Sequence, residues 1–265
     1  MKNFRFWSIL LALTATTSNF GLCCNEVVAA NSLQTSMQMN GMRANKSILI
    51  DNHVVYSDTV GDVTRGLLAY YNFDNGTANN AAGLQNNGVI NGAALFVDDT
   101  PNGKGKALFL DQEQFVNVAR NPLKGKESYT VSLWVKNFGA GYLFSTGAND
   151  RYSTPSLFIN TEGKIGISYV CTPFNYYAKS LQTSGWHMLT LVQTGEEYEL
   201  YVDGNIVDNI NDRASVEGNK MQIGGRNDMD YVLPWTDPFK VDNVRIYGVA
   251  LTEEEVGKLY HYEKK

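Results

Sequence analysis

The sequence VDNVRIY at residues 241–247 has the alternation of a β-strand, and the rest of the chain can be interpreted outward from it. Side chains two residues apart in a strand point to the same side, which places Asp242, Val244 and Ile246 on one face. An acid that faces an apolar core needs a partner, because burying an unpaired carboxylate is costly. Three kinds of partner could satisfy this carboxylate: a cation held together with backbone carbonyls, an arginine, or a set of backbone N–H groups.

A helix is predicted directly after this strand. Thr252 can cap it, and Glu255, three residues later, completes a capping box. Val256, Leu259 and Tyr260 recur at helical spacing and form an apolar face. The helix is therefore expected to pack back on the strands near the start of the domain.

Composition sets the outer limits on function. A chain of 265 residues suits one large domain or one domain with extensions. Its formal net charge is −5 and it has no basic cluster, which argues against nucleic acid or an anionic membrane surface as a partner. A surface that is acidic and rich in Tyr and Asn fits a neutral polar ligand such as a sugar.

The first 23 residues have the pattern of an export signal. Lys2 and Arg5 precede an apolar run at residues 6–13 that is too short to span a bilayer. The end of this segment is similar to a bacterial lipoprotein signal, which predicts lipidation of Cys24; the alternative is ordinary cleavage that leaves a free cysteine. The predicted location is the bacterial cell envelope, with a lipid-anchored outer-membrane or cell-surface position and no other membrane contact.

Residues 24–65 are polar and are predicted to be a tether or N-terminal extension, with two short candidate strands at 47–50 and 53–56. From Gly66 onward, short strand-like runs arrive at regular spacing, with Gly, Asn, Asp or Pro in almost every gap. Asp203-Gly204 is a strong hairpin signal. The pattern predicts an all-β sandwich of antiparallel strands. Cys171 ends an apolar run and is expected to be a plain buried thiol.

Four landmarks in this order and at these separations resemble the laminin-G-like jelly roll of the concanavalin A-like lectin and glucanase superfamily. The likeness covers residues 66–260 and implies a two-sheet antiparallel jelly-roll sandwich with one short C-terminal helix, over a domain of residues 66–265. The landmarks are residues 66–74 with the turn at 86–88, residues 129–136, Trp186-His187 followed by residues 200–204, and residues 241–247 followed by 251–255.

The resemblance also implies a structural calcium ion. In the family the strand pair that corresponds to Asp74 and Asp242 often holds one, with backbone carbonyls completing a hard-oxygen shell. This chain departs from the family at Asn243, where a second acid is frequent, and at Asn79 and Asn80, where an Asp is usual. Fewer carboxylates imply weaker calcium binding, and the alternative is that these acids cap backbone N–H groups at the rim of the sandwich.

Catalysis is not expected. Glucanases of this fold carry acids in the pattern Glu-x-Asp-x-x-Glu, and retaining hydrolysis needs two carboxyl groups about 5 Å apart. The pattern is absent, and the nearest approach, Glu197-Tyr198-Glu199, lies on a predicted hairpin strand with a solvated face. His187 follows Trp186 as in the family, which indicates packing and a hydrogen bond, and no serine motif accompanies it.

Candidate ligand-binding residues lie in three loops. The loop at residues 226–238 is longer and more aromatic than a plain connection needs. Tyr231 and Trp235 could stack on a sugar ring while polar groups bond its hydroxyls. Alternatively, the aromatic residues close the edges of the sandwich, or Asp228, Asp230 and Asp237 hold a cation. The remaining candidates are Arg226, Asn227 and Asp228 in the same loop, Tyr152 in a second loop and Tyr176 in a third.

These patterns together predict a non-catalytic, lectin-like lipoprotein that recognises a glycan or a glycosylated surface through the concave sheet face and the loops. A structural or protein-interaction module of the cell surface is the alternative. A glycoside hydrolase with an unorthodox site is the third hypothesis.

Overall fold

The computed structural model describes residues 47–50, 53–56, 62–83, 85–147, 155–168, 175–181, 184–211, 216–228, 231–233 and 237–265. The chain forms two compact units, Met1–Ser57 and Asp58–Lys265. In the first unit, β1 (Ser47–Ile50) and β2 (His53–Tyr56) pair antiparallel, as the two candidate strands predict. Cys24, Tyr152, Cys171 and Trp235 lie outside the described residues.

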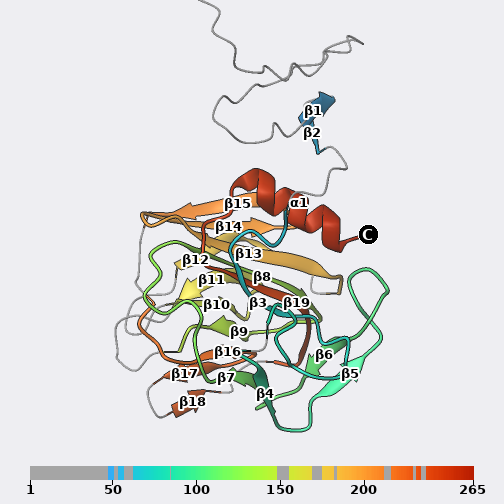
Figure 1. Ribbon diagram of the computed structural model, residues 1–265, viewed down its shortest axis with the longest axis vertical. Helices are drawn as coiled ribbons and strands as arrows, with labels where there is room; N and C mark the ends of the chain where they lie inside the picture. The colour runs from blue at the N-terminus through green and yellow to red at the C-terminus, as the bar shows by residue number, and fades with distance from the viewer. Residues whose placement is uncertain are drawn as a thin grey trace, which may run out of the picture. The chain divides into compact units, whose positions relative to one another are not determined.

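The second unit is a sandwich of two antiparallel sheets, which confirms the predicted fold class (Figure 1). The first sheet has seven strands in the order β12 (Asn175–Ser180), β11 (Lys164–Ser168), β10 (Ser156–Ile159), β9 (Gly141–Ser145), β16 (Met221–Ile223), β7 (Phe115–Val118) and β4 (Gly88–Asn91). The strands from β12 to β9 are consecutive in the sequence, whereas β16 pairs with β9 and β7, which lie about 80 and about 100 residues earlier in the chain.

The second sheet has eight strands and carries the landmarks at both ends of the domain. Its order is β15 (Asn205–Ile210), β14 (Tyr198–Val202), β13 (His187–Gln193), β8 (Tyr129–Lys136), β19 (Phe239–Tyr247), β6 (Ala107–Leu110) and β5 (Leu95–Val97), with β3 (Leu67–Tyr71) also paired with β19. The first landmark strand, β3, is therefore joined directly to the last one, β19.

The core lies between the sheets and consists of aliphatic and aromatic side chains from both. Val116, Leu143 and Ile223 come from the seven-stranded sheet, and Val131 and Leu189 come from the eight-stranded sheet. All five are almost completely buried. Burial of a Val, Leu or Ile side chain contributes about 1.5–3 kcal/mol, so this cluster dominates the stability of the domain.

Asp242 does not share a face with Val244 and Ile246, so that prediction is wrong. Asp242 pairs with Trp134 and Arg245 pairs with Ser132, so three steps along β19 match two along β8. The extra residue forms a β-bulge in which Asn243 has a φ of 48°. Val244 and Ile246 face the core between the sheets, whereas Asp242 lies opposite Trp134 on the outer face of the eight-stranded sheet.

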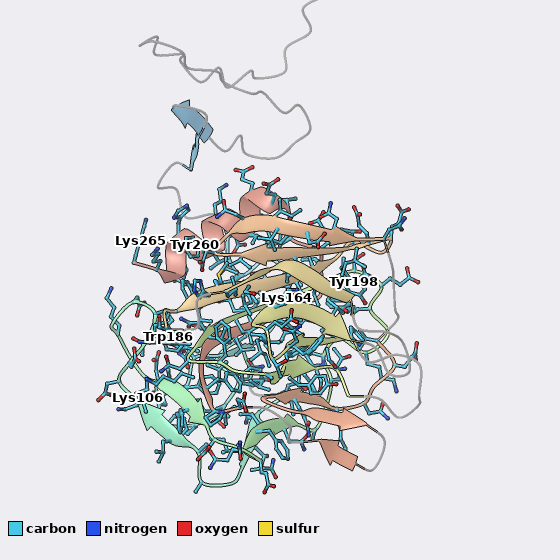
Figure 2. All side chains as sticks on the ribbon, turned by 180° about the vertical axis from the view of Figure 1, so that it is seen from behind. Lys106, Lys164, Trp186, Tyr198, Tyr260 and Lys265 are labelled. Carbon is cyan, nitrogen blue, oxygen red and sulfur yellow. The ribbon has the colours of Figure 1, made fainter. Side chains whose placement is uncertain are left out.

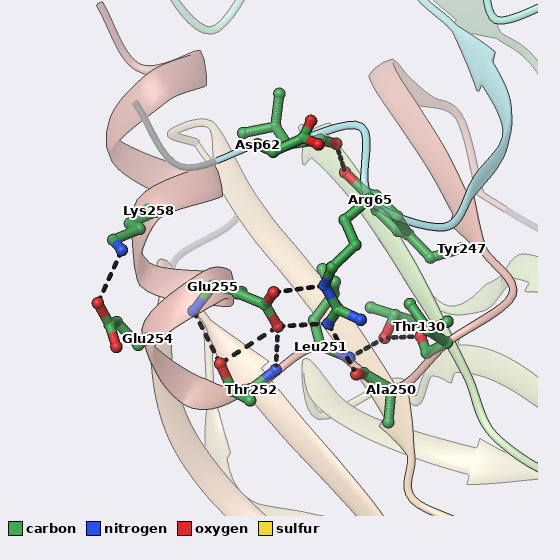
Figure 3. Close-up of polar contacts among 12 residues, drawn as sticks. Asp62, Arg65, Thr130, Tyr247, Ala250, Leu251, Thr252, Glu254, Glu255 and Lys258 are labelled. Carbon is green, nitrogen blue, oxygen red and sulfur yellow. Dashed lines mark hydrogen bonds and ion pairs between the residues drawn. The ribbon is translucent and has the colours of Figure 1, made fainter. Parts of the chain in front are cut away.

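The predicted C-terminal helix is α1 (Glu253–Glu263), and its capping box is present. The Thr252 backbone N–H donates to Glu255 Oε2 at 2.8 Å, and the Glu255 backbone N–H donates to the Thr252 hydroxyl at 3.3 Å. Arg65 adds a two-pronged ion pair to the same carboxylate, with Nε and Nη2 each 2.7 Å from a Glu255 oxygen (Figure 3). The start of the domain is thus fastened to the first turn of its last element.

The apolar face of α1 covers the outer face of the eight-stranded sheet. Val256 and Leu259 are buried in a second hydrophobic cluster with Trp134 and Met188. The ring of Tyr260, labelled in Figure 2, stacks on Trp134 with the centroids 5.5 Å apart. Within the residues that the structure describes, no helix is long and apolar enough to cross a membrane.

Candidate ligand-binding face

Three polar side chains form a row across the outer face of the seven-stranded sheet. Gln222 of β16 lies directly opposite Asn117 of β7 on one side and Ser145 of β9 on the other. The strand neighbours of Gln222, Met221 and Ile223, face the core, so alternation directs Gln222 away from it. We call Asn117, Gln222 and Ser145 the polar row.

Each member of the polar row keeps a buried oxygen without a hydrogen-bond partner. The atoms are Asn117 Oδ1, Gln222 Oε1 and Ser145 Oγ. Gln222 is 1% exposed and Ser145 is 0% exposed, whereas Asn117 is half-buried. A buried polar atom without a partner costs about 1–3 kcal/mol, so three in one row indicate a place where a ligand or ordered water supplies the missing donors.

An aromatic pair lies on the same face beside the polar row. Tyr142 of β9 is opposite Phe158 of β10, and their ring centroids are 5.8 Å apart at an angle of 40°. A bulge in β9 between these pairs keeps Leu143 and Phe144 in the core while Tyr142 and Ser145 share the outer face. Aromatic rings beside a few polar groups are the usual composition of a small-molecule or sugar site.

The predicted binding loop begins beside this face. Its residues Arg226, Asn227 and Asp228 form β17 (Arg226–Asp228), and Tyr231 begins β18 (Tyr231–Leu233), with which β17 makes a hairpin. The strand β17 contacts β16 and β9, which are two of the three strands of the polar row (Figure 1). The structure therefore brings the backbone of these four predicted residues next to the row.

A glycine makes the sharp exit from β16 into this hairpin possible. Gly224 has a φ of 83°, and a Cβ there would lie 2.5 Å from Leu110 Cδ1. Only glycine fits both the left-handed backbone and the close approach without a shift of Leu110.

The other predicted ligand residues lie elsewhere or outside the described part. Tyr176 is on β12, at the far edge of the seven-stranded sheet, and three strands separate β12 from β16. Tyr152 and Trp235 fall outside the described residues. Of the alternative cation set, Asp237 has a described side chain, which accepts the Ala140 backbone N–H at 2.9 Å and so holds a neighbouring loop.

The sequence carries a signal for the polar row outside the loops. Asn117 and Gln222 are single polar residues between apolar neighbours in FVNV and MQI, which is the alternation of a strand with one non-core face. Pairing of β16 with β7 and with β9 depends on contacts between distant parts of the chain, so the row itself cannot be predicted from local pattern.

The predicted calcium residues meet at a different place, on the eight-stranded sheet. Asp242 is 3% exposed and accepts the Asn243 N–H at 2.7 Å. The pKa of the Asp242 carboxyl is raised to about 8: burial is the largest cause, the Asn243 N–H opposes it, and the charges of Asp74 and Glu263 add to it. Asp74 is exposed, and its carboxylate accepts the Lys106 backbone N–H at 3.0 Å and the Asn72 side-chain amide at 2.9 Å.

The donor set at Asp242 fits a hard cation. The arginine on the same face, Arg245, is already paired with Glu263 at 2.5 Å and lies over the Tyr70 ring at 3.7 Å, so it does not neutralise Asp242. Within the described residues no group of three or more His, Cys, Asp or Glu side chains could hold a metal ion. A calcium ion at Asp74 and Asp242 would therefore need backbone or amide oxygens to complete its shell.

Two further polar clusters lie on the eight-stranded sheet. Asp99 accepts hydrogen bonds from Lys136 at 2.9 Å, Lys240 at 2.5 Å and the Trp186 indole at 3.1 Å. Burial would raise the pKa of Asp99, but these bonds outweigh it and lower the pKa to about 2. His187 Nδ1 lies 2.7 Å from Asp203 Oδ2, which matches the predicted hydrogen-bonding role of this histidine.

The chain belongs to the concanavalin A-like lectin/glucanases superfamily, whose laminin-G family model matches residues 110–257. No curated protein sequence matches it. Among solved structures, it is similar to domain 4 of AbnA, an extracellular arabinanase from Geobacillus stearothermophilus, in complex with arabinotriose. That likeness has a TM-score of 0.61 and 24% identity, and it covers 73% of this chain and 98% of that domain.

Two toxin-domain structures are also similar in fold. One is a structure of botulinum neurotoxin type C, whose cell entry depends on interaction with two ganglioside molecules. Its TM-score is 0.56 and its identity 12%, and the likeness covers 76% of this chain and 52% of that one. The other is the binding domain of botulinum neurotoxin DC in complex with rat synaptotagmin II, with a TM-score of 0.55, 13% identity and coverage of 74% and 51%. At these identities the likeness establishes the shared fold.

Proposed function

We propose that this protein binds a glycan, without catalysis, on the outer face of the seven-stranded sheet and the adjoining β17–β18 hairpin. The observation that carries the proposal is the polar row, where Asn117, Gln222 and Ser145 each keep a buried oxygen without a partner. Hydroxyl groups of a sugar are donors, so a glycan at the half-buried Asn117 would supply a donor at the open end of the row.

The surroundings of the row support a sugar rather than another polar ligand. The Tyr142–Phe158 pair lies next to the row with 5% of each residue exposed, and sugar rings present C–H groups that pack on aromatic rings. The hairpin that carries Arg226 to Asp228 and Tyr231 adjoins β16 and β9. One structural neighbour of the same fold holds arabinotriose, which makes that trisaccharide the first probe to use.

Binding is tested by affinity electrophoresis of the full chain in gels that contain arabinan or another polysaccharide. We expect the wild-type protein to be retarded and Trp235→Ala to lose most of that retardation, because Trp235 is the proposed stacking platform of the loop. Equal retardation of Trp235→Ala would remove this residue from the site. Migration unaffected by every polysaccharide would contradict the proposed function.

The proposal excludes hydrolysis for a chemical reason. The polar row consists of amides and a hydroxyl, whereas glycoside hydrolases of most families need a pair of carboxyl groups at the scissile bond. Glu199, in the pair nearest to a glucanase pattern, accepts the Tyr201 hydroxyl at 2.6 Å on β14 of the other sheet. Incubation with mixed polysaccharides should release no reducing sugar, and released sugar would contradict the proposal.

We further propose that the protein is exported and anchored in the cell envelope through a lipid on Cys24. Metabolic labelling with a fatty-acid analogue should mark the wild-type protein and leave Cys24→Ser unmarked. Labelling of both proteins would place the lipid elsewhere, and labelling of neither would favour cleavage without lipidation.

Calcium is proposed as a structural ion at Asp74 and Asp242. A bound cation would stabilise the ionised Asp242 carboxylate, which burial disfavours. Millimolar calcium should raise the melting temperature of the wild-type protein and should have little effect on Asp242→Asn. Equal shifts for both proteins, or none for the wild type, would rule out this site.

Protein recognition is a second candidate, and one observation favours it. The strand β15 forms an edge of the eight-stranded sheet and exposes Ile206 at 39% and Val207 at 43%. An edge strand with exposed apolar side chains can pair with another chain. Cross-linking in envelope extract should then trap a partner through β15, and loss of that product in Val207→Lys would identify the strand as the contact.

A further inference from the structure

We propose that the polar row makes the protein selective for uncharged glycans, so that chains carrying carboxylate groups are rejected. The inference rests on the proposed function, because it names the class of glycan that the same face accepts. It concerns Asn117 as the accessible member of the row, and Gln222 and Ser145 as its buried members.

The side chains that line this face are almost all neutral. In the part of the chain whose side chains the structure describes, which leaves out most of β12, the strands of the seven-stranded sheet direct one charged side chain to the outer face, Lys164. Its ammonium group is paired with Glu162 at 2.8 Å, so its charge is already balanced. The neutral residues of the face are Val89, Asn91, Phe115, Asn117, Tyr142, Ser145, Ser156, Phe158 and Gln222.

The unpartnered atoms of the row also have the wrong polarity for an anion. Asn117 Oδ1 and Gln222 Oε1 are oxygens that accept only, and a ligand carboxylate brings acceptors only; the Ser145 hydroxyl can donate or accept. If the amides turned to present their N–H groups instead, an anion would find donors in the row but no positive charge among the row's own side chains. Burial of a charge without a partner of opposite sign is strongly unfavourable.

Exposure along the row indicates where a ligand makes first contact. Val89 of β4 lies opposite Asn117 and is 62% exposed, Asn117 is half-buried, and Gln222 and Ser145 are closed off. Neighbouring strands lie about 4.8 Å apart, so the row from Asn117 to Ser145 spans about 10 Å. Substitution at Asn117 therefore changes the ligand contact with the least disturbance to folding.

A matched pair of polymers tests the charge selectivity. Homogalacturonan with methyl-esterified carboxyl groups is neutral, and the same preparation after de-esterification is anionic. The full chain should bind neutral polymers, including arabinan and the esterified polymer, at least ten-fold more tightly than the de-esterified one. Equal or tighter binding of the de-esterified polymer would overturn the inference and leave the proposed function standing, whereas binding of no polymer would overturn both.

High salt distinguishes selectivity that comes from the polar row from selectivity that comes from the net charge of the protein. The chain has a net charge of −5, which repels any polyanion over a distance that salt shortens to about 3 Å at 1 M. Selectivity that comes from the row should persist in 1 M NaCl, because the buried acceptors are not screened. Selectivity that disappears in 1 M NaCl would contradict the inference.

A pair of lysine variants assigns the effect to the row. Asn117→Lys places a positive charge at the open end of the row, and Asn209→Lys makes the same change in net charge at an exposed position of β15 on the other sheet. Asn117→Lys should bind the de-esterified polymer at least ten-fold more tightly than Asn209→Lys does. Equal affinities of the two variants would overturn the role of the row.

Discussion

Single atoms explain why the two sheets of this molecule differ in chemistry. On the seven-stranded sheet, Gln222 Oε1 is buried and has no partner. On the eight-stranded sheet, the carboxylate of Asp99 has three donors and a pKa of about 2. Gln222 Oε1 lacks a hydrogen-bond donor that a ligand can supply, whereas the Asp99 carboxylate finds its donors within the protein.

Replacing Gln222 by Met should therefore stabilise the free protein. Methionine has a similar length and no polar atom, so Gln222→Met removes the cost of the unpartnered oxygen and should raise the free energy of unfolding by about 1–2 kcal/mol. Urea unfolding measures the change, and the same variant should lose glycan binding. A destabilised Gln222→Met would mean that the amide has a structural partner, which would contradict the assignment of the row.

Asp99 should make stability depend on acid. Its pKa is lowered to about 2 in the folded state from an ordinary 3.8, so the stabilisation is present above pH 4 and is lost as the pH falls toward 2. The urea midpoint of the wild type should exceed that of Asp99→Asn at pH 6, and the two should converge near pH 2. A gap that stays constant from pH 6 to pH 2 would show that the Asp99 contacts with Lys136 and Lys240 do not titrate as described.

At the scale of elements, the C-terminal helix is held by a buried ion pair. Glu263 Oε1 lies 2.5 Å from Arg245 Nε of β19, and Glu263 Oε2 accepts the Trp134 indole N–H at 2.7 Å. Burial raises the pKa of the Glu263 carboxyl, and the Arg245 guanidinium and the Trp134 N–H oppose that shift. Both side chains are almost fully buried, so solvent screens the pair little.

Removal of one partner should be far more damaging than removal of both. Glu263→Ala leaves the Arg245 charge buried and unpaired, which should lower the free energy of unfolding by about 3–5 kcal/mol. The double variant Glu263→Leu with Arg245→Met should recover much of that loss, because no charge remains buried. Chemical denaturation of the three proteins gives the comparison, and a double variant as unstable as Glu263→Ala would contradict this explanation.

The bulge in β19 is a feature that the sequence pattern of the strand does not predict. The strand and the capped helix after it were predictable from alternation and from Thr252 and Glu255, although β19 begins at Phe239, two residues before the predicted stretch. The reversal of faces at Asn243 was not predictable, because the inserted residue of a bulge does not interrupt the alternating pattern of the sequence. Asn tolerates a positive φ better than most residues, so Asn243 was the one local hint.

At the scale of the whole molecule, the fold was predictable and much of the site was not. Many short strands with turn residues between them, together with the four landmarks, indicated a two-sheet jelly roll, and the sheets confirm it. The polar row depends on β7, β16 and β9 becoming neighbours although they come from distant parts of the chain. Pairing over such distances is set by the packing of the entire core, which no short segment encodes.

The loops predicted to bind ligand and the face that carries the row are parts of one surface. The hairpin β17–β18 follows β16 directly and contacts β9. The strand β17, whose residues the sequence singled out, thus adjoins β16, which carries Gln222. The proposed glycan site combines a sheet floor that supplies hydrogen-bond acceptors with a loop rim that supplies further contacts.

The central claim is that a glycan binds on the polar row, and the affinity of Asn117→Ala tests it most directly. Titration calorimetry with a polysaccharide that retards the wild-type protein should give a dissociation constant at least ten-fold weaker for Asn117→Ala, with no change for the matched variant Asn209→Ala on the other sheet. An Asn117→Ala protein that is folded and binds with the wild-type dissociation constant would contradict the account.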